Sequence, residues 1–424
     1  MSKIVIIGGK LQGCEAAYLG KEAGIDVILI DSSPDAPAQK LCSEFICADV
    51  LSDDERVAEA LESADMILPT MENDAVLKGL TELSEKKGYT LAFDWDAYRI
   101  TSSKTKSDKL FADNGLPCPR YYPAGEAPYI AKPESESGSH GVIRFESREA
   151  VERYLKEGGR NAVIQEFVEG PSYSVEIIGM PGNYRTYEPT RIFVDDVYDC
   201  NYASAYRDLP QETITELSRL AEEIAELIGL HGIMDLEVID NGSELKVLEI
   251  DARLPSQTSI VVYHASGMNY IKELYDIFVN GRFCSEQTNK GHCASLTHYL
   301  FSDGKFSSHG EHIMVEGSIL EYTGGICSRA EVLSDRENSS GKAWRGTFIN
   351  HAPSYEQLMA DEEVMKDELA YAAEETRNQD AAVPKQEAAI REQEEEICKT
   401  RIFRSLAAAD ASVLTNPAVL TDVI

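Results

Sequence analysis

The most informative stretch of this sequence is GIMDLEVIDNGSELKVLEID, residues 232–251. Two apolar, β-branched runs flank Asn241-Gly242, a dipeptide that favours a tight hairpin turn. Side chains alternate along a strand, so Glu249 and Asp251 share one face and the hairpin brings Glu237 beside them. Three carboxylates between apolar neighbours repel one another unless a cation lies among them, and such hard oxygen ligands suit Mg²⁺. We therefore predict a magnesium site on a hairpin, rather than a solvated acidic edge.

Cationic groups that suit phosphate stand before and after this hairpin. Arg253 follows Asp251 on the same face and is placed to contact a transferred phosphoryl group. Lys132 ends an apolar strand and precedes the loop 134–141, whose small residues offer backbone N–H groups to a polyphosphate. Lys104 alone is typical of a solvated surface and gains meaning only from the other groups. Together these residues favour a nucleotide site.

The N-terminus has the pattern of a doubly wound α/β domain. A β-branched strand, Lys3–Gly8, is followed by a glycine turn, a helix and a second strand that ends at Asp31. The turn GGKLQG resembles a dinucleotide fingerprint, but Lys10 replaces the glycine that lets pyrophosphate approach. Lys10 at a helix N-terminus favours an anion. An NAD-dependent oxidoreductase stays an alternative, although it leaves the carboxylate hairpin unexplained.

The order of the predicted elements indicates α/β and α+β domains without an internal repeat. We expect further helices and strands through residue 250, and a helical, acidic segment over 355–396. The expected domains are an N-terminal Rossmann-like domain (1–98), a central module (99–170), a C-terminal domain carrying the Mg site (171–380) and a tail (381–424). The expected elements include helices 53–63, 75–86, 102–114, 147–157 and 212–228, and strands 66–69, 90–93, 129–132, 142–145, 162–167 and 174–178.

Composition limits the classes of partner. The 424 residues include 40 Lys and Arg against 73 Asp and Glu, a net charge of −33, which disfavours nucleic acid and anionic membranes. The sequence has no run of 18 apolar residues and no signal peptide, so we expect a cytoplasmic protein. The acidity is either a solvated surface or adaptation to a high-salt cytoplasm. The nine cysteines include no Cys-x-x-Cys pair, which predicts reduced, mostly buried thiols and no metal bound through sulfur.

The joint order of these motifs over residues 1–260 resembles the ATP-grasp ligases. Two lysines bracket a module, followed by a small-residue phosphate loop, a Gln-Glu-Phe-Val hinge at 165–168 and Glu-x-Asp-x-Arg at 249–253. Within this family, the segments CEAAYL (14–19) and IDARLPSQT (250–258) are similar to the pyrrolysine-biosynthesis branch, which joins 3-methyl-D-ornithine to L-lysine. The resemblance implies an ATP-grasp fold with an N-terminal pre-ATP-grasp domain, a central lid module and a C-terminal domain.

The resemblance also implies roles by position. Catalysis would rest on Arg253 and Lys132, with two Mg²⁺ ions on Glu237, Glu249 and Asp251. The residues implied for ATP are Lys104, Lys132, Ser139, Gln165, Glu166, Phe167, Val168 and Glu249, with Lys10, Asp31, Asp49, Val50 and His298 also approaching nucleotide. The residues implied for the ornithine-like substrate are Ser174, Val175, Glu176, Asp235, Arg253, Leu254, Pro255, Ser256, Gln257 and Thr258, and for lysine Leu11, Gln12 and Glu72.

The implied reaction is ligation through an acyl phosphate, which releases ADP and phosphate and leads to an isopeptide. Positioning and electrostatics carry such catalysis, so no nucleophilic Ser or Cys is needed. Two departures from the family pattern are Ser172, where an acidic ribose ligand is frequent, and Gln165, where Glu is frequent. Alternatives are another amino-acid ligase, such as a D-alanine–D-alanine type, and an inactive ATP-binding scaffold. The partners expected are the two small-molecule substrates and a second copy in a homodimer.

Overall fold

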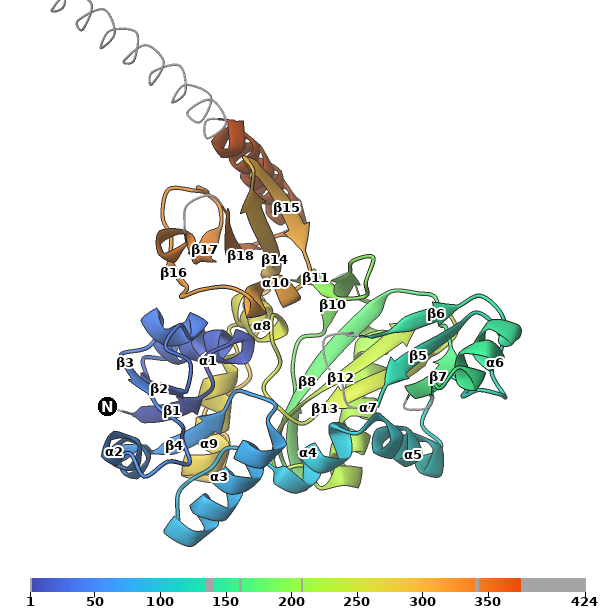
Figure 1. Ribbon diagram of the computed structural model, residues 1–424, viewed down its shortest axis with the longest axis horizontal. Helices are drawn as coiled ribbons and strands as arrows, with labels where there is room; N and C mark the ends of the chain where they lie inside the picture. Colours follow the sequence, from blue (N-terminus) through green and yellow to red (C-terminus); the bar gives the residue numbers. More distant parts are fainter. Residues whose placement is uncertain (1, 135–140, 160–161, 207–208, 340–342, 375–424) are drawn as a thin grey trace, which may run out of the picture. The chain divides into compact units, whose positions relative to one another are not determined.

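A computed structural model describes residues 2–134, 141–159, 162–206, 209–339 and 343–374 (Figure 1). The chain divides into two compact units, of which the first comprises Met1–Ser302 and Phe306–Leu369. Both cavities described below are lined by residues of this first unit.

The N-terminal part builds the parallel sheet that the sequence predicts. Its strand order is β3-β2-β1-β4, with every pair parallel. The strand interiors are almost fully buried because aliphatic residues fill both faces of the sheet. The elements are β1 (Lys3–Ile7), α1 (Leu11–Glu22), β2 (Asp26–Asp31), β3 (Glu44–Cys47), α2 (Glu55–Ser63), β4 (Met66–Pro69) and α3 (Asp74–Lys87), with a 3₁₀ turn at Pro37–Lys40.

A small antiparallel sheet follows, with the order β6-β5-β7. Helix α5 precedes it and is capped at Ser103, whose side chain accepts the Lys106 N–H. The elements are α4 (Trp95–Thr101), α5 (Lys104–Asn114), β5 (Tyr129–Pro133), β6 (Ile143–Phe145), α6 (Arg148–Lys156) and β7 (Ala162–Glu166).

The largest sheet has eleven strands and is antiparallel. Its central path runs β13-β12-β8-β10-β11-β14-β18-β17-β16. Helix α7 packs Leu217, Leu220 and Ile224 into the core beneath β8 and β12. The strands are β8 (Ser172–Met180), β9 (Asn183–Thr186), β10 (Thr190–Val194), β11 (Cys200–Ala205), β12 (Gly232–Asp240), β13 (Leu245–Asp251), β14 (Cys293–Ser302), β15 (Lys305–His309), β16 (Glu321–Tyr322), β17 (Glu331–Ser334) and β18 (Ala343–Ala352). The helices are α7 (Gln211–Ile228), α8 (Thr258–Ser266), α9 (Tyr270–Asn280) and α10 (His312–Val315), with a 3₁₀ turn at Arg336–Asn338.

The predicted hairpin is present as β12 and β13, and it contains an irregularity that the sequence does not reveal. Glu237 faces Glu249, yet the next residue, Val238, faces Val247. Leu248 is therefore the extra residue of a bulge, and it reverses the side-chain alternation of β13. Val247 lies in the core, whereas Leu248 and Glu249 both line a cavity.

Most predicted elements are confirmed, but two predictions are wrong. Residues 90–93 form no strand, because Leu91 makes only an isolated bridge to Ile67. The thiols are not mostly buried: of the eight described cysteines, only Cys14 and Cys293 are, since several others lie at strand ends and in loops. The predicted helix over 355–396 is helical through residue 374, and its remainder, with the tail, lies outside the described residues.

None of the described helices is long and apolar enough to cross a lipid bilayer.

Candidate functional site

A cavity of about 600 Å³ lies between the small sheet and the hairpin, and we call it the smaller cavity. Strands β5 and β7 form one wall, and β10, β12 and β13 contribute to the others. Because these strands come from separate parts of the chain, the cavity collects groups that are far apart in sequence. The predicted residues that line it are Lys104, Lys132, Gln165, Glu166, Phe167, Val168, Glu237 and Glu249.

Lysine and carboxylate meet directly in this cavity. Lys104 Nζ lies 2.8 Å from Glu249 Oε1, and both side chains are largely shielded from solvent. Burial opposes ionisation of Glu249, but Lys104 and Lys132 outweigh burial and lower its pKa. Glu249 is therefore a carboxylate at neutral pH, as a metal ligand must be.

The neighbouring carboxyls carry the electrostatic signature of a cation site. Burial and the nearby Glu249 raise the pKa of Glu237 to about 7. Burial also raises the pKa of Asp251 to about 8, against the opposing effect of Arg253. Such repulsion between buried acids is relieved by a bound cation. The donor set, carboxylate oxygens alone, suits Mg²⁺. Among the described residues, however, Glu237, Glu249 and Asp251 do not form a cluster whose ligand atoms all lie within 4.8 Å of one another, so the predicted ligand set stays a prediction.

The hinge segment is held at both of its ends. Phe167 N donates to Pro128 O at 2.7 Å, and Glu166 accepts from Arg120 N and Nε at 3.0 and 2.8 Å. Gln165 is buried and its Nε2 donates to Asp108 at 3.4 Å, while its Oε1 has no partner among the described residues. Ser172 lines the same cavity and donates to Val238 O. Ser139 and most of its loop lie outside the described residues.

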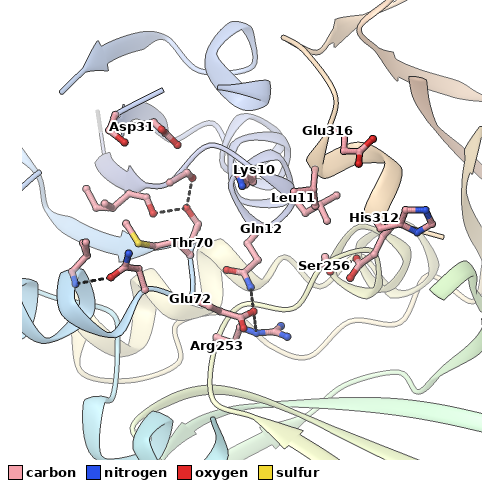
Figure 2. Close-up of a pocket in the computed structure, with 18 of the residues that line it drawn as sticks. Lys10, Leu11, Gln12, Asp31, Thr70, Glu72, Arg253, Ser256, His312 and Glu316 are labelled. Atoms are coloured by element: carbon pink, nitrogen blue, oxygen red, sulfur yellow. Dashed lines mark hydrogen bonds and ion pairs between the residues drawn. The ribbon is translucent and has the colours of Figure 1, made fainter. Parts of the chain in front are cut away.

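A second cavity, of about 1270 Å³, lies beside the glycine turn, and we call it the larger cavity. It shares Val142 and Tyr198 with the smaller cavity, so the two adjoin. Figure 2 shows that its walls come from the N-terminal sheet, the turn after β13 and the segment around α10. The predicted residues that line it are Lys10, Leu11, Gln12, Asp31, Asp49, Val50, Glu72, Arg253 and Ser256.

Glu72 joins two of these walls. Its Oε1 accepts from Gln12 Nε2 at 3.0 Å and lies 2.6 Å from Arg253 Nε (Figure 2). Arg253 also contacts Asp251 Oδ2 through Nη2, at 3.0 Å. Arg253 is thus fixed between Asp251 at the end of β13 and Glu72 on the wall of the larger cavity. The structure therefore brings Arg253 near the hairpin but not into the cavity of Lys104 and Lys132.

The glycine turn is explained by packing. Asp31 accepts from Gly9 N at 2.6 Å and from Ser33 N at 2.7 Å, so backbone groups occupy both of its oxygens. A Cβ at Gly13 would lie 2.2 Å from Gly8 O, which requires glycine there. Lys10 is exposed at the N-terminus of α1. These contacts account for the turn without a dinucleotide, which removes the main support for the oxidoreductase alternative.

Several predicted substrate residues line neither cavity. Glu176 is fully buried and accepts from Tyr270 Oη at 2.8 Å and from Ser174 Oγ at 3.2 Å. Asp235, paired in register with Glu176 and Asp251, is buried, and its Oδ1 has no partner among the described residues. His298 is buried against Thr347, and burial lowers its pKa to about 3. The residues absent from both cavity walls are Ser174, Val175, Glu176, Asp235, Asp251, Leu254, Pro255, Gln257, Thr258 and His298.

The structure also supplies residues that sequence reasoning missed. Glu311, just before α10, accepts hydrogen bonds from Ser256 Oγ at 2.6 Å and from Gln257 Nε2 at 3.1 Å. Glu15 of α1 accepts the backbone N–H groups of Gln257 and Ile260 at 2.9 and 3.1 Å. Gln257 has φ +65°, a conformation that needs such support. No local pattern announces these contacts, since each joins segments at least 54 residues apart.

Comparison with known proteins identifies relatives over most of the chain. The ATP-grasp domain family matches residues 101–257. The 3-methyl-D-ornithine–L-lysine ligase of Methanosarcina barkeri is 35% identical over 320 residues, which are 75% of this chain and 85% of that protein. The ligase of Methanosarcina mazei is 39% identical over 281 residues, which are 66% of this chain and 73% of that protein.

Solved structures share the fold at low identity. The ADP complex of an N5-carboxyaminoimidazole ribonucleotide synthetase has a TM-score of 0.65 and 16% identity, covering 86% of this chain and 96% of that one. A biotin carboxylase domain dimer from Hydrogenobacter thermophilus, solved with MgADP and bicarbonate, has a TM-score of 0.64 and 17% identity, covering 85% and 88%. The predicted ATP-grasp fold is confirmed.

Proposed function

Because the chain belongs to the family of the 3-methyl-D-ornithine–L-lysine ligases and carries an ATP-grasp domain, we propose that it joins these two amino acids at the expense of ATP. The carboxylate of 3-methyl-D-ornithine would be phosphorylated, and the ε-amine of L-lysine would displace the phosphate. This reaction is the lysine-coupling step of pyrrolysine biosynthesis.

The observation that carries the proposal is the meeting of Lys104, Lys132, Glu237 and Glu249 in one cavity below the hinge segment. Phosphoryl transfer needs positive charge at the phosphates and anionic ligands for a divalent cation, and this cavity offers both. A scaffold that only holds ATP without transferring phosphoryl groups has no need of the anionic ligands for a divalent cation.

Residues of the smaller cavity hold the nucleotide in this proposal. Lys104 and Lys132 bind phosphate oxygens, and Ser139 joins them. The segment Gln165–Val168 lines the adenine, with Gln165 Oε1 available to its amine. Glu237, Glu249 and Asp251 hold two Mg²⁺ ions, which neutralise phosphate charge when bound. Because Ser172 stands where many family members have an acidic ribose ligand, other groups would bind the ribose hydroxyls here.

Arg253 links the two half-reactions. Its guanidinium, held by Glu72 and Asp251, stabilises the charge on the acyl phosphate as the ATP γ-phosphoryl moves to the carboxylate. In the second step the lysine nitrogen forms the amide bond, the bond from acyl carbon to phosphate oxygen breaks, and phosphate leaves with the electron pair. The amine proton passes to the departing phosphate or to water. Leu11, Gln12 and Glu72 orient the lysine, and Ser174, Val175, Glu176, Asp235 and residues 254–258 surround the diamino acid.

The charge of the larger cavity supports amino-acid substrates with extra amines. Its walls carry seven carboxylates against two permanently charged cations, Lys10 and Arg253. Such a cavity favours cationic ligands over small neutral ones. The carboxylates are Asp31, Asp49, Glu72, Asp196, Asp199, Glu311 and Glu316.

The proposal also covers the domain organisation, the location and the assembly of the protein. We keep the four expected domains, a cytoplasmic location and a homodimer, the last supported by the dimeric biotin carboxylase neighbour. We also keep the prediction that Lys10, Asp31, Asp49, Val50 and His298 approach nucleotide, although the first four line the larger cavity and His298 lines neither. Light scattering of the purified protein measures the homodimer directly.

The decisive experiment mixes the full chain with Mg·ATP, D-ornithine as a stand-in for its methylated form, and L-lysine at high salt, with products followed by mass spectrometry. An adduct and ADP that require both amino acids are expected. ADP formation with a different acid and amine, such as two D-alanines, would overturn the substrate pair. No ATP turnover with any pair in a folded sample would leave the scaffold alternative.

A further inference from the structure

Glu311 is a carboxylate on the wall of the larger cavity that no predicted motif contains. It precedes α10, about 55 residues beyond the turn that follows β13, and its backbone N donates to Cys200 O at 3.0 Å. Its side chain reaches back to the turn, where one oxygen, Oε2, accepts from both Ser256 and Gln257. Gln257 is itself fixed, since Nε2 also donates to Cys200 O at 3.1 Å.

The charge of Glu311 is not balanced by a fixed cation. Among the described residues no ion pair includes Glu311, and both of its side-chain hydrogen bonds come from neutral groups. Burial and Asp199 raise its pKa, while Ser256, Gln257 and Arg253 oppose them. A shielded carboxylate of this kind is costly unless a positive group approaches it. The cavity in front of it can admit one.

The other acidic groups near the turn are less available. Glu176, which is predicted to bind the diamino acid, is fully buried and already accepts hydrogen bonds from Tyr270 and Ser174. Glu72 is engaged by Gln12 and Arg253. Glu311 has one oxygen that no protein hydrogen bond uses among the described residues, on the wall that also carries Ser256 and Arg253.

We propose that Glu311 is a specificity-determining residue that binds an ammonium group of the diamino acid whose carboxylate is phosphorylated. The inference rests on the proposed ligation and assigns one contact within it. Ser256 and Gln257, predicted to surround this substrate, act as positioning residues that aim the carboxylate into the cavity. The enzyme then selects a diamino acid over a monoamino acid by pairing a buried charge.

The experiment separates the charge of Glu311 from its support of the turn. Glu311→Gln keeps an oxygen that accepts from Ser256 and Gln257 but removes the negative charge. Acyl phosphate formation is trapped as a hydroxamate with hydroxylamine, so that lysine is not needed. Three acids are compared: D-ornithine, 5-aminopentanoate, which lacks the α-amine, and D-norvaline, which lacks the side-chain amine.

The wild type is expected to prefer D-ornithine to both analogues. In Glu311→Gln, the preference over one analogue should fall by about 30-fold, the loss typical of one buried charge pair, while the preference over the other persists. The analogue that loses its disadvantage identifies the amine that Glu311 binds. Glu311→Asp keeps the charge and should keep both preferences, with a higher KM for D-ornithine. Glu363→Gln, an exposed carboxyl paired with Lys366, is the matched control and should behave as wild type.

An equal fall of kcat/KM for all three acids would overturn the inference, since it indicates a role in folding the turn alone. If Glu311→Gln kept the wild-type preference for D-ornithine over both analogues, the inference would be overturned as well. If Glu311→Gln does not fold, loss of the preference in Glu311→Asp would contradict the inference and retention would support it. Failure of the proposed ligation is recognised separately, because the wild type would then form no hydroxamate with D-ornithine.

Discussion

The two adjoining cavities differ in the segments of the chain that line them and in the charge of the ligands that they suit. The smaller cavity sets two lysines against the carboxylates of one hairpin, so positive and negative groups pair inside it. The larger cavity is lined by seven carboxylates and gathers loop segments from the first, middle and last thirds of the described chain. The first arrangement suits a phosphate with its divalent cation, and the second suits ligands that carry ammonium groups.

This difference indicates which part of the site a fold supplies and which part sets specificity. The charged groups of the smaller cavity lie on regular elements, α5, β5, β12 and β13, and such elements position the groups of a site more precisely than loops do. The acidic walls of the larger cavity come from loops, where substrate preference varies most readily. Substitutions in the two cavities should therefore give different kinetic phenotypes.

The largest effect is expected for Glu249→Gln in the smaller cavity. The substitution removes a carboxylate that binds metal in our proposal, and with it the negative charge 2.8 Å from Lys104 Nζ. ADP formation should fall by at least about 10³-fold, because the charge balance at the phosphates is lost. Glu244→Gln, on the same hairpin and ion-paired with Lys246, should leave ADP formation unchanged. Coupled ADP assays on folded samples measure both, and residual activity near wild type would exclude Glu249 as a ligand.

Glu72→Gln should change the larger cavity alone. The KM for L-lysine should rise by about 30-fold, because the carboxylate that orients the lysine in our proposal loses its charge. Hydroxamate trapping of the acyl phosphate should stay within about threefold of wild type, because Asp251 still holds Arg253 at 3.0 Å. Asp74→Asn, in the first turn of α3, is the neighbouring control. Equal losses in trapping and in lysine coupling would contradict the separation of the two cavities.

A smaller effect is expected when one lysine of the phosphate site is removed. Lys104→Ala should raise the KM for ATP by about tenfold, with Lys132 still present to neutralise charge. The KM for L-lysine should not change. Lys109→Ala, on the same helix and ion-paired with Asp113, supplies the comparison. An unchanged ATP KM in the Lys104 variant would remove Lys104 from the nucleotide site.

The smaller cavity could be predicted largely from sequence because its chemistry lies on regular elements. Alternation and the Asn241-Gly242 turn predict that Glu237 lies beside Glu249 and Asp251, and the structure pairs Glu237 with Glu249. The pairing itself depends on a bulge, since an unbroken ladder beyond Val238–Val247 would set Leu248 opposite Glu237. The bulge at Leu248 could not be predicted, since two-residue periodicity assumes an unbroken ladder. Without that bulge, Glu249 would share the core-facing side of Val247.

The larger cavity was harder to predict because its contacts join distant loops. Glu311 meets Ser256, and Glu72 meets Arg253, only after distant segments of the chain have packed together. Family resemblance supplied Glu72, but nothing in the sequence marks Glu311 among 73 acidic residues. Resemblance also assigned Val175 and His298, whose side chains the structure places in buried surroundings away from both cavities.

The smallest effect is expected for Glu15, a buried residue of α1 that accepts the backbone N–H groups of Gln257 and Ile260 in the turn after β13. Burial raises its pKa to about 8, against the Gln257 and Ile260 N–H groups and with help from Glu311 and Glu176. Between pH 4.5 and 8 the folded protein thus holds a proton that the unfolded chain has lost, so this group's stabilisation declines as pH rises through that window.

Glu15→Gln should remove this contribution, flattening the dependence of the unfolding free energy on pH by at most about 1.4 kcal/mol per pH unit. Thermal unfolding of both proteins from pH 5 to 9 measures the difference, with Glu22→Gln at the exposed end of α1 as control. Glu176 and Glu311 remain in both proteins, so their titration cancels in the comparison to first order. Parallel curves would show that the N–H groups of Gln257 and Ile260 keep Glu15 ionised, which would make the turn a charged rather than a neutral junction.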